Sequence, residues 1–196
     1  MSPIIIGLVG GIASGKSTVA RLFAAERRAV HVDADAIARR VLERPAVRAA
    51  LARRIPGLGA KGRLDREMLA RRVFRDEKAL AALEEVTHPP IRRAVLAALR
   101  RARAPYVLLD AALLQETAAD GLCDLVVYVA CPARTRRART RRRRGWSEAH
   151  HRAREARQWS CRRKRARADF VIDNGNGLDR TRRDVRRLIR GLEKGS

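Results

Sequence analysis

Short apolar runs alternate along this chain with stretches whose apolar residues have helical spacing. The runs are residues 4–9, 29–32, 105–110, 125–130 and 170–174. Each has the length of a buried strand. In the last stretch, 179–192, Val185, Leu188 and Ile189 fall on one face of a helix. We therefore predict an α/β fold, in which a five-stranded, parallel, doubly wound sheet carries helices on both faces.

The stretch between the second and third runs is longer than a simple crossover needs. A charged, amphipathic helical pattern fills residues 45–103, which predicts a helical substrate-binding subdomain at 36–104 within a single domain of residues 1–196. We expect Asp65 to cap one of its helices. We expect another helix to stop at His88-Pro89-Pro90, and a new helix to carry Ile91 and the apolar residues after it.

The residues after the first run carry the clearest chemical signal. Residues 10–17 read Gly-Gly-Ile-Ala-Ser-Gly-Lys-Ser between a predicted strand and a predicted helix, which is the context of a phosphate-binding loop. Gly10 and Gly15 let backbone N–H groups approach phosphate oxygens, and the N-terminus of the following helix points at the same phosphates. Lys16 would contact the β- and γ-phosphates, and the Ser17 hydroxyl would bind Mg²⁺.

Acidic residues end two other predicted strands, where ligands of open α/β sheets bind. Asp33 follows the second run, and we interpret it as the group that orients or deprotonates an attacking hydroxyl. Asp35 is expected to cap the next helix; the alternative is that both are caps or solvated acids. Asp110 ends the third run and is typical of a Walker-B aspartate that holds Mg²⁺ directly or through water. Glu116 offers a second acidic contact, whereas His31, inside a strand, is expected to be structural.

Positive charge dominates the composition. The net charge is +24, and 40 of the 45 basic residues are arginine, a bias that could reflect genomic base composition rather than a partner. Non-specific binding to nucleic acid at low salt is expected. Residues 134–167 alone hold 15 Arg and one Lys against two Glu. With Ser147 capping a helix that runs through Gln158, they predict a basic lid that closes over a triphosphate. The alternatives are a solvated face or an RNA-binding patch.

Nothing in the sequence predicts secretion or membrane insertion. It shows no secretory leader, and its longest apolar run is far too short to span a bilayer. The three cysteines have neither zinc-site nor C-x-x-C spacing, and an odd number without a framework suits a reducing cytosol. We expect a cytoplasmic protein with no membrane partner, either a monomer or a weak homo-oligomer.

Several motifs, in this order and spacing, resemble the dephospho-coenzyme A kinase family, which itself resembles the nucleoside monophosphate kinases. The matches include residues 7–18, Val-Asp-Ala-Asp at 32–35, Leu-Asp-Arg at 64–66, Thr-His-Pro at 87–89 with Arg92, Leu-Leu-Gln-Glu at 113–116, Arg139 with Arg143, Arg154 with Gln158, Lys164, and Ile172-Asp173-Asn174. A phosphate loop alone is shared by many proteins. The combination is far more specific, and it runs nearly from end to end.

The resemblance implies transfer of the γ-phosphoryl group of ATP to the 3′-hydroxyl of dephospho-coenzyme A, the last step of coenzyme A synthesis, with Mg²⁺. The implied catalytic residues are Asp33, Lys16, Arg139 and Arg143. The implied ATP-binding residues are Gly11, Ile12, Ala13, Ser14, Gly15, Lys16, Ser17, Thr18 and Asn174, the last near the adenine. The implied acceptor-binding residues are Asp33, His88, Arg92, Leu113, Leu114, Glu116 and Arg154. The implied metal ligands are Ser17 and Asp110.

Three positions depart from the family pattern. Ala13 stands where a glycine is usual, Ala112 where a proline is usual, and Gln115 where an aromatic residue is usual. A methyl group at position 13 would alter the fit of the loop to phosphate, and the other two changes would alter the shape of the acceptor pocket. None of the three removes a charged group from the implied catalytic set.

Two other functions remain open on the residues alone. One is another small-molecule or nucleotide kinase of the same fold, which would still use Asp33. The other is a nucleic-acid-binding protein that uses its phosphate loop as a nucleotide switch, an alternative motivated by residues 134–167. Against the second, only 4% of the residues are aromatic, and no pair of RNA-recognition aromatics is present to stack bases.

Overall fold

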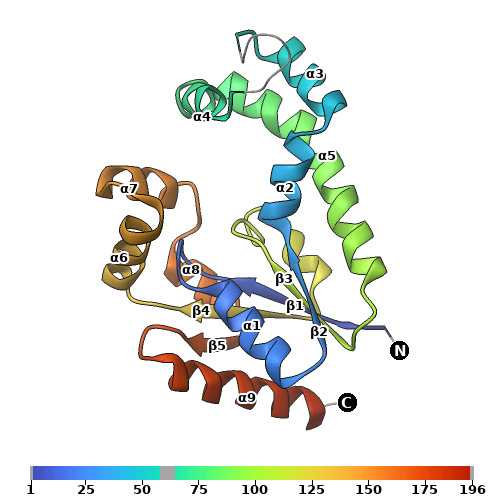
Figure 1. Ribbon diagram of the computed structural model, residues 1–196, viewed down its shortest axis with the longest axis vertical. Coiled ribbons are helices and arrows are strands. Elements are labelled where there is room, and N and C mark those ends of the chain that lie inside the picture. The colour runs from blue at the N-terminus through green and yellow to red at the C-terminus, as the bar shows by residue number, and fades with distance from the viewer. Residues whose placement is uncertain (1, 58–64, 195–196) are drawn as a thin grey trace. The chain divides into compact units, whose positions relative to one another are not determined.

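Five parallel strands form one sheet in the computed structural model, which describes residues 2–57 and 65–194. The strands are β1 (Ile4–Val9), β2 (Ala29–Asp33), β3 (Tyr106–Asp110), β4 (Leu125–Ala130) and β5 (Phe170–Asp173). Their order is β2-β3-β1-β4-β5, so the chain passes from β1 to the edge strand β2, returns to β3 between them, and then adds β4 and β5 on the other side of β1 (Figure 1). The predicted doubly wound parallel sheet is confirmed. β1 lies at its centre, so the phosphate loop leaves from the middle of the carboxyl edge.

Helices and turns cover both faces of this sheet. Outside residues 34–101, the helices and turns are α1 (Lys16–Glu26), the 3₁₀ turn η1 (Ala119–Leu122), α6 (Ala133–Arg144), α7 (Glu148–Glu155), α8 (Cys161–Ala166) and α9 (Leu178–Lys194). On one face, α1 and α9 share a core with the strands. In this core the rings of Phe23 and Tyr106 pack edge to face, with their centroids 5.3 Å apart. On the other face, Leu114 and Cys123 lie against Gly7, where a side chain would approach them to less than 3 Å. The absence of a side chain at Gly7 therefore lets the chain after β3 pack directly on the sheet.

Residues 34–101 form a second compact unit, while residues 1–33 and 102–196 form the first. The second unit holds α2 (Ala34–Leu42), α3 (Pro45–Arg54), α4 (Arg66–Arg75) and α5 (Glu77–Arg101), and α5 packs against the other three. The predicted cap is confirmed, because the Met68 N–H donates to Asp65 Oδ1 at 3.0 Å. Leu64 of the Leu-Asp-Arg match lies outside the described residues.

The prediction that a helix stops at His88-Pro89-Pro90 is wrong, because α5 is one helix with both prolines inside it. Proline has no N–H, so two rungs of the backbone ladder are missing, and a proline inside a helix costs about 3 kcal/mol or more. Packing outweighs this defect. Buried side chains lie on both sides of the pair, Thr87 before it and Val95 after it, and α5 contacts α2, α3 and α4.

Two predicted helix ends also differ from the structure. Asp35 lies within the first turn of α2 and not before it, because β2 runs into the helix without a loop. Ser147 does cap α7, accepting a bond from the His150 N–H at 3.2 Å. However, α7 ends at Glu155, before Gln158, and the hydroxyl of Ser160 starts α8 by accepting from the Arg163 N–H. A serine thus caps each of the two helices where one was predicted.

In the described residues, none of the helices combines the length and the apolar character that crossing a membrane requires. The three cysteines are free thiols.

Candidate active site

The phosphate loop joins β1 to α1 and places a helix N-terminus at the carboxyl edge of the sheet. Gly15 is the N-cap residue of α1 and has φ of 95°, in the left-handed region that favours glycine. A side chain there would collide with Asn174, which donates to the Ser14 carbonyl at 2.6 Å. The first turn of α1 holds no acidic side chain. Its backbone N–H groups and the helix dipole therefore suit an anion.

Ala13, the departure from the family pattern within the loop, also has a left-handed backbone, with φ of 59°. A residue with a Cβ is strained there by about 1–2 kcal/mol. The conformation is held by its neighbours, since Arg139 Nη1 donates to the carbonyl oxygens of Ala13 at 3.3 Å and Ser14 at 3.2 Å. The loop thus keeps its turn without the usual glycine.

Asp110 at the end of β3 collects three polar groups. The Ser17 hydroxyl donates to Oδ2 at 2.9 Å, Lys16 Nζ lies 3.5 Å from Oδ1, and His31 Nε2 lies 3.6 Å from Oδ2. Burial alone would raise the pKa of Asp110. The bond from His31, the charge of Lys16 and the bond from Ser17 outweigh burial and lower that pKa. Asp110 is therefore an ionised carboxylate in contact with the two residues that were predicted to handle phosphate and metal.

Asp33 lies beside this cluster, at the end of β2. It is in register with Asp110 on the neighbouring parallel strand, and neighbouring strands lie about 4.8 Å apart. Asp33 is half-buried. The sheet therefore places both predicted acids at one edge, next to the phosphate loop.

The predicted arginines lie on α6 and α7 in different environments. Arg139 of α6 is half-buried and reaches the phosphate loop, and its Nη2 also donates to the Asn174 carbonyl at 3.0 Å. Arg143, one turn further along α6, is exposed. Arg154 of α7 donates to His150 Nε2 at 2.8 Å and lies 4.9 Å from the Trp146 ring. Burial and the charges of neighbouring arginines lower the pKa of Arg154.

Glu116 takes part in a buried cluster on the chain after β3. Its Oε1 lies 2.9 Å from Lys164 Nζ and accepts from the Trp159 N–H at 2.7 Å. Lys164 also donates to the carbonyl of Ala112 at 2.8 Å, and burial lowers its pKa although Glu116 opposes that shift. Gln115 is buried and lies within hydrogen-bonding distance of the Lys164 carbonyl. Ala112 and Gln115, two of the positions that depart from the family pattern, therefore both contact the buried Lys164.

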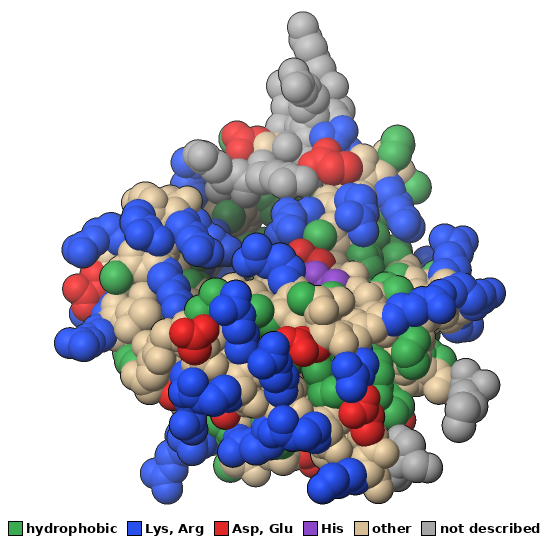
Figure 2. Space-filling view, turned by 60° about the horizontal axis from the view of Figure 1, so that its bottom comes forward, with side chains coloured by type: hydrophobic (Ala, Val, Ile, Leu, Met, Phe, Trp, Pro, Cys, Tyr) green, Lys and Arg blue, Asp and Glu red, His purple; other side chains and the backbone are tan. Residues whose placement is uncertain are grey.

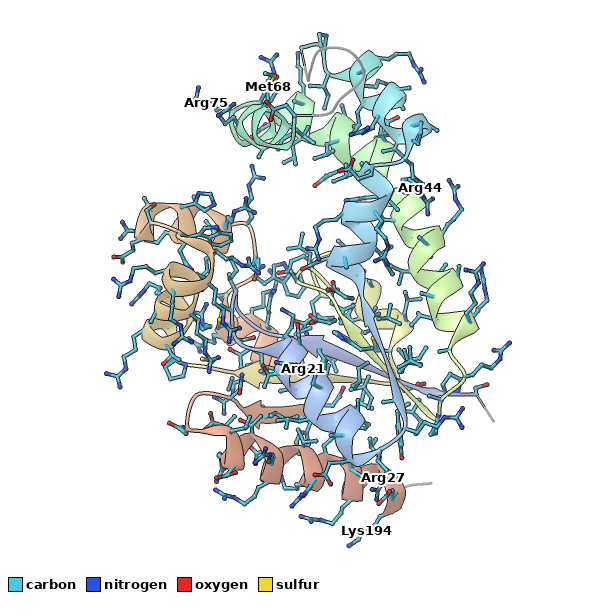
Figure 3. The ribbon with its side chains drawn as sticks, in the orientation of Figure 1. Arg21, Arg27, Arg44, Met68, Arg75 and Lys194 are labelled. Carbon is cyan, nitrogen blue, oxygen red and sulfur yellow. The ribbon has the colours of Figure 1, made fainter. Side chains whose placement is uncertain are left out.

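The remaining predicted acceptor residues differ in burial and lie in different units. Leu113 is exposed, whereas Leu114 is buried against Gly7. In the 34–101 unit, His88 and Arg92 are exposed and lie four residues apart on α5. The same unit has a pocket between α4 and the start of α5, where Met68 and Arg75 are labelled in Figure 3. Its lining residues are Met68, Arg71, Arg72, Arg75, Asp76, Glu77 and Lys78.

A divalent cation fits the donors at Asp110. In the described part of the chain, no three His, Cys, Asp or Glu side chains cluster as a metal site would need. Mg²⁺ does not need such a cage, because it keeps several waters and binds through one or two protein oxygens plus substrate phosphates. The ionised Asp110 and the Ser17 hydroxyl, bonded to each other at 2.9 Å, supply that small oxygen set.

Sequence reasoning missed three residues near the site. His31 was expected to be structural, but its ring faces Asp110. Lys164 was only a motif match, yet it is buried on Glu116. Arg136 lies against Gly11 of the phosphate loop. It is one of many arginines in its segment, and nothing in the sequence distinguishes it from the others. Of the three, only His31 had a local signal, because its ring lies two residues before Asp33 on the same strand.

Known proteins resemble this chain over nearly its whole length. A family model described as dephospho-CoA kinase matches residues 4–180. A curated relative from Rhodopseudomonas palustris, named dephospho-CoA kinase, is 39% identical over 97% of this chain and 96% of its own. A crystal structure from Thermus thermophilus has a TM-score of 0.89 and 38% identity, covering 98% of both chains. A shikimate kinase from Acinetobacter baumannii, 19% identical with a TM-score of 0.58 over 100% of this chain and 96% of its own, shares the fold alone.

Proposed function

The chain belongs to the dephospho-CoA kinase family, and we propose that Lys16, Asp110 and Asp33 are central to its transfer of a phosphoryl group from ATP to the 3′-hydroxyl of dephospho-CoA. Membership of the family makes the protein a kinase with ATP as donor and dephospho-CoA as acceptor. Neither another small-molecule acceptor nor a nucleic-acid-binding role is favoured by these relatives. Figure 2 adds that Lys and Arg side chains are spread over the face in view rather than gathered in one stripe.

The observation that carries the residue assignment is the convergence on Asp110. Lys16 and Ser17, the last two residues of the phosphate-loop motif, both contact this carboxylate. We propose that residues 11–18 bind the ATP phosphates through backbone N–H groups, with Lys16 supplying a mobile charge. Mg²⁺, when bound, neutralises charge on the phosphates, and Ser17 and Asp110 would hold it. Asn174, bonded to the loop at Ser14, would lie near the adenine.

Asp33 is proposed to orient the acceptor hydroxyl and to take its proton. It ends a strand beside Asp110, so an acceptor bound at this edge of the sheet would meet both the phosphates and a carboxylate. Arg139 and Arg143 are proposed to stabilise charge on the transferred group from a lid at 134–167.

The acceptor is proposed to bind through the 34–101 unit. His88 and Arg92 present a polar pair on one face of α5, and the pocket at α4 is lined by four cationic side chains, which suit a phosphorylated molecule. Leu113, Glu116 and Arg154 are the proposed acceptor contacts of the other unit. Leu114, which is buried, would act by shaping the chain around them.

Two further properties belong to the same proposal. The unpaired thiols suit a reducing compartment, so we place the enzyme in the cytoplasm. We also propose that it works as a monomer or a weak homo-oligomer, and that it binds nucleic acid only non-specifically at low salt.

The test is a transfer assay with ATP, Mg²⁺ and dephospho-CoA, in which both ADP and coenzyme A are measured. Asp33→Asn should lose most turnover while ADP still binds, because the amide cannot take the proton. Asp179→Asn, an exposed aspartate on α9, is the matched control and should leave the rate unchanged. Wild-type turnover in Asp33→Asn would remove the base assignment. Turnover only with AMP, CMP or shikimate would replace the acceptor.

A further inference from the structure

Two arginines of α6 reach the phosphate loop, and the second of them has no role in the proposed reaction. Arg139 binds the carbonyls of Ala13 and Ser14, as described above. Arg136 lies one turn earlier on the same helix and is only 5% exposed, so it is the single buried arginine of α6. A buried guanidinium is costly unless its donors are used, so its partners indicate what it does.

Arg136 lies against Gly11. A Cβ added to Gly11 would stand 2.5 Å from Nη1, 2.7 Å from Cζ and 3.0 Å from Nε of Arg136. Three atoms of the guanidinium thus cover the place where a side chain would be, and the group lies directly on the loop backbone. The Gly11 carbonyl accepts from the Ser14 N–H at 3.0 Å, so the covered residue is one end of the turn that forms the loop.

Two oxygens hold Arg136 in this position. Its Nε donates to the Cys131 carbonyl at 3.2 Å, at the end of β4. Its Nη1 donates to Oε1 of Glu155, which is on α7. Because Nε and Nη1 both donate to protein oxygens, these contacts make Arg136 a support of the loop and not a group aimed at phosphate.

We propose that Arg136 is a positioning residue for phosphoryl transfer, which holds Gly11 in place from α6 and is itself held by Glu155 of α7. The loop keeps its N–H groups aimed at the ATP phosphates only while this contact exists. This inference rests on the proposed function, because it assumes that the phosphates lie in the loop. It links the docking of α7 on α6 to nucleotide binding, since the same ion pair serves both.

A purely structural role would have a different signature. Removing one partner of a buried ion pair destabilises a protein whatever its function. A positioning role also predicts a selective defect. The kcat/KM for ATP and the dissociation constant for ADP should change, while the KM for dephospho-CoA should not. The flat guanidinium matters as well, because the ammonium of a lysine could reach Glu155 but has no planar face to lie on Gly11.

The experiment is steady-state kinetics with each substrate varied, together with the dissociation constant for ADP, at a temperature where every variant is folded. Arg136→Ala should lower kcat/KM for ATP about 10- to 100-fold, the scale of a small misplacement of reacting groups. Arg136→Lys should not restore it. Glu155→Gln should lower it in the same direction, and the double variant should lose no more than Arg136→Ala alone, because the two residues act as one unit.

The matched controls come from α7, the helix that carries Glu155. Arg152 and Glu148 form an ion pair on α7 whose side chains are 69% and 61% exposed. Arg152→Ala and Glu148→Gln should leave all constants unchanged. If they reproduce the defect, the effect comes from lost charge in α7 and the positioning role is wrong.

Three results would overturn the proposal. The first is wild-type kinetics in Arg136→Lys, which would show that charge alone is enough. The second is tighter ADP binding in Glu155→Gln, which would make Arg136 a phosphate ligand that Glu155 neutralises. The third is wild-type nucleotide binding in Arg136→Ala beside a Lys16→Ala variant that binds none. If Lys16→Ala itself binds ADP normally, the proposed function fails, so the two failures are distinguishable.

Discussion

Helices α6 and α9 are both rich in arginine, yet only α9 buries an apolar stripe. α9 buries Val185, Leu188 and Ile189 in the core that it shares with α1 and the sheet. Its arginines face outward, and Figure 3 shows Lys194 of α9 beside Arg27, which pairs with Glu193 at 2.6 Å. α6 has no apolar stripe, and the side chains that it buries are Arg136 and Thr140.

The difference shows that the same residue type does two kinds of work here. The exposed pairs of α9, such as Arg186 with Glu26 at 2.8 Å, are screened by solvent and contribute little to stability. The α6 arginines bind backbone and carboxylate oxygens beside the phosphate loop, where a lost partner leaves a polar group unsatisfied. Changes on α6 should therefore affect catalysis, and changes on α9 should affect stability.

The largest expected effect is at Arg139. Arg139→Ala should lower kcat by about 10³-fold, the lower end for an arginine that stabilises a transferred phosphoryl group. The comparison is sharpened by Arg186→Ala on α9, which removes an exposed pair and should leave kcat unchanged. For both variants, kcat is measured from ADP formation in the transfer assay with ATP, Mg²⁺ and dephospho-CoA. Similar rates in the two variants would erase the distinction between the helices and remove Arg139 from the catalytic set.

Next in size is the apolar face of α9. Leu188 is 4% exposed, and Leu188→Ala should lower the free energy of unfolding by about 2–5 kcal/mol through lost burial and a cavity. Urea unfolding monitored by circular dichroism measures this loss. The KM for ATP should not change while the variant is folded. A raised KM without a loss of stability would mean that α9 also serves the site.

The smallest effect is a pH dependence centred on α6 and α7. His151 is buried, its Nδ1 lies 3.0 Å from the Thr140 hydroxyl, and burial lowers its pKa, with Glu155 opposing and Arg136 and Arg137 adding to the shift. The unfolded chain then takes up a proton near pH 6.5 that the folded chain does not. Stability should fall as pH falls below about 6.5, by at most about 1.4 kcal/mol per pH unit.

Thermal unfolding between pH 7.5 and 5.5 tests this effect. His151→Asn keeps an amide near the position of Nδ1 and should reduce the slope. His150→Asn changes the exposed neighbour and should leave the slope as it is. Equal slopes in wild type and His151→Asn would show that another group controls stability in this range.

Local patterns predicted the parts of the site that are contiguous in sequence. The phosphate loop follows a buried strand and precedes a helix, and Asp110 closes another strand, so spacing alone placed each at the carboxyl edge of a parallel sheet. The caps at Asp65 and Ser147 were predictable for the same reason, because a cap bonds to N–H groups two or three residues away.

Patterns failed where distant packing outweighed local preference. The pair Pro89-Pro90 normally ends a helix, yet contacts with three other helices carry α5 through it. His31 was expected to be structural because it lies inside a strand, and its partner Asp110 is 79 residues away, on the adjacent strand.

The sequence by itself determined the strand–loop–helix that binds phosphate, the order of the five strands along the chain, and the acids that end two of them, since each depends on residues within a few positions. Only the tertiary structure decided which strands are neighbours and which of 40 arginines matter. Arginine has the same flexible side chain and charge at every position. Its role is set by what the fold brings to it, a carbonyl and a bare glycine at Arg136, or a partly exposed glutamate at Arg186.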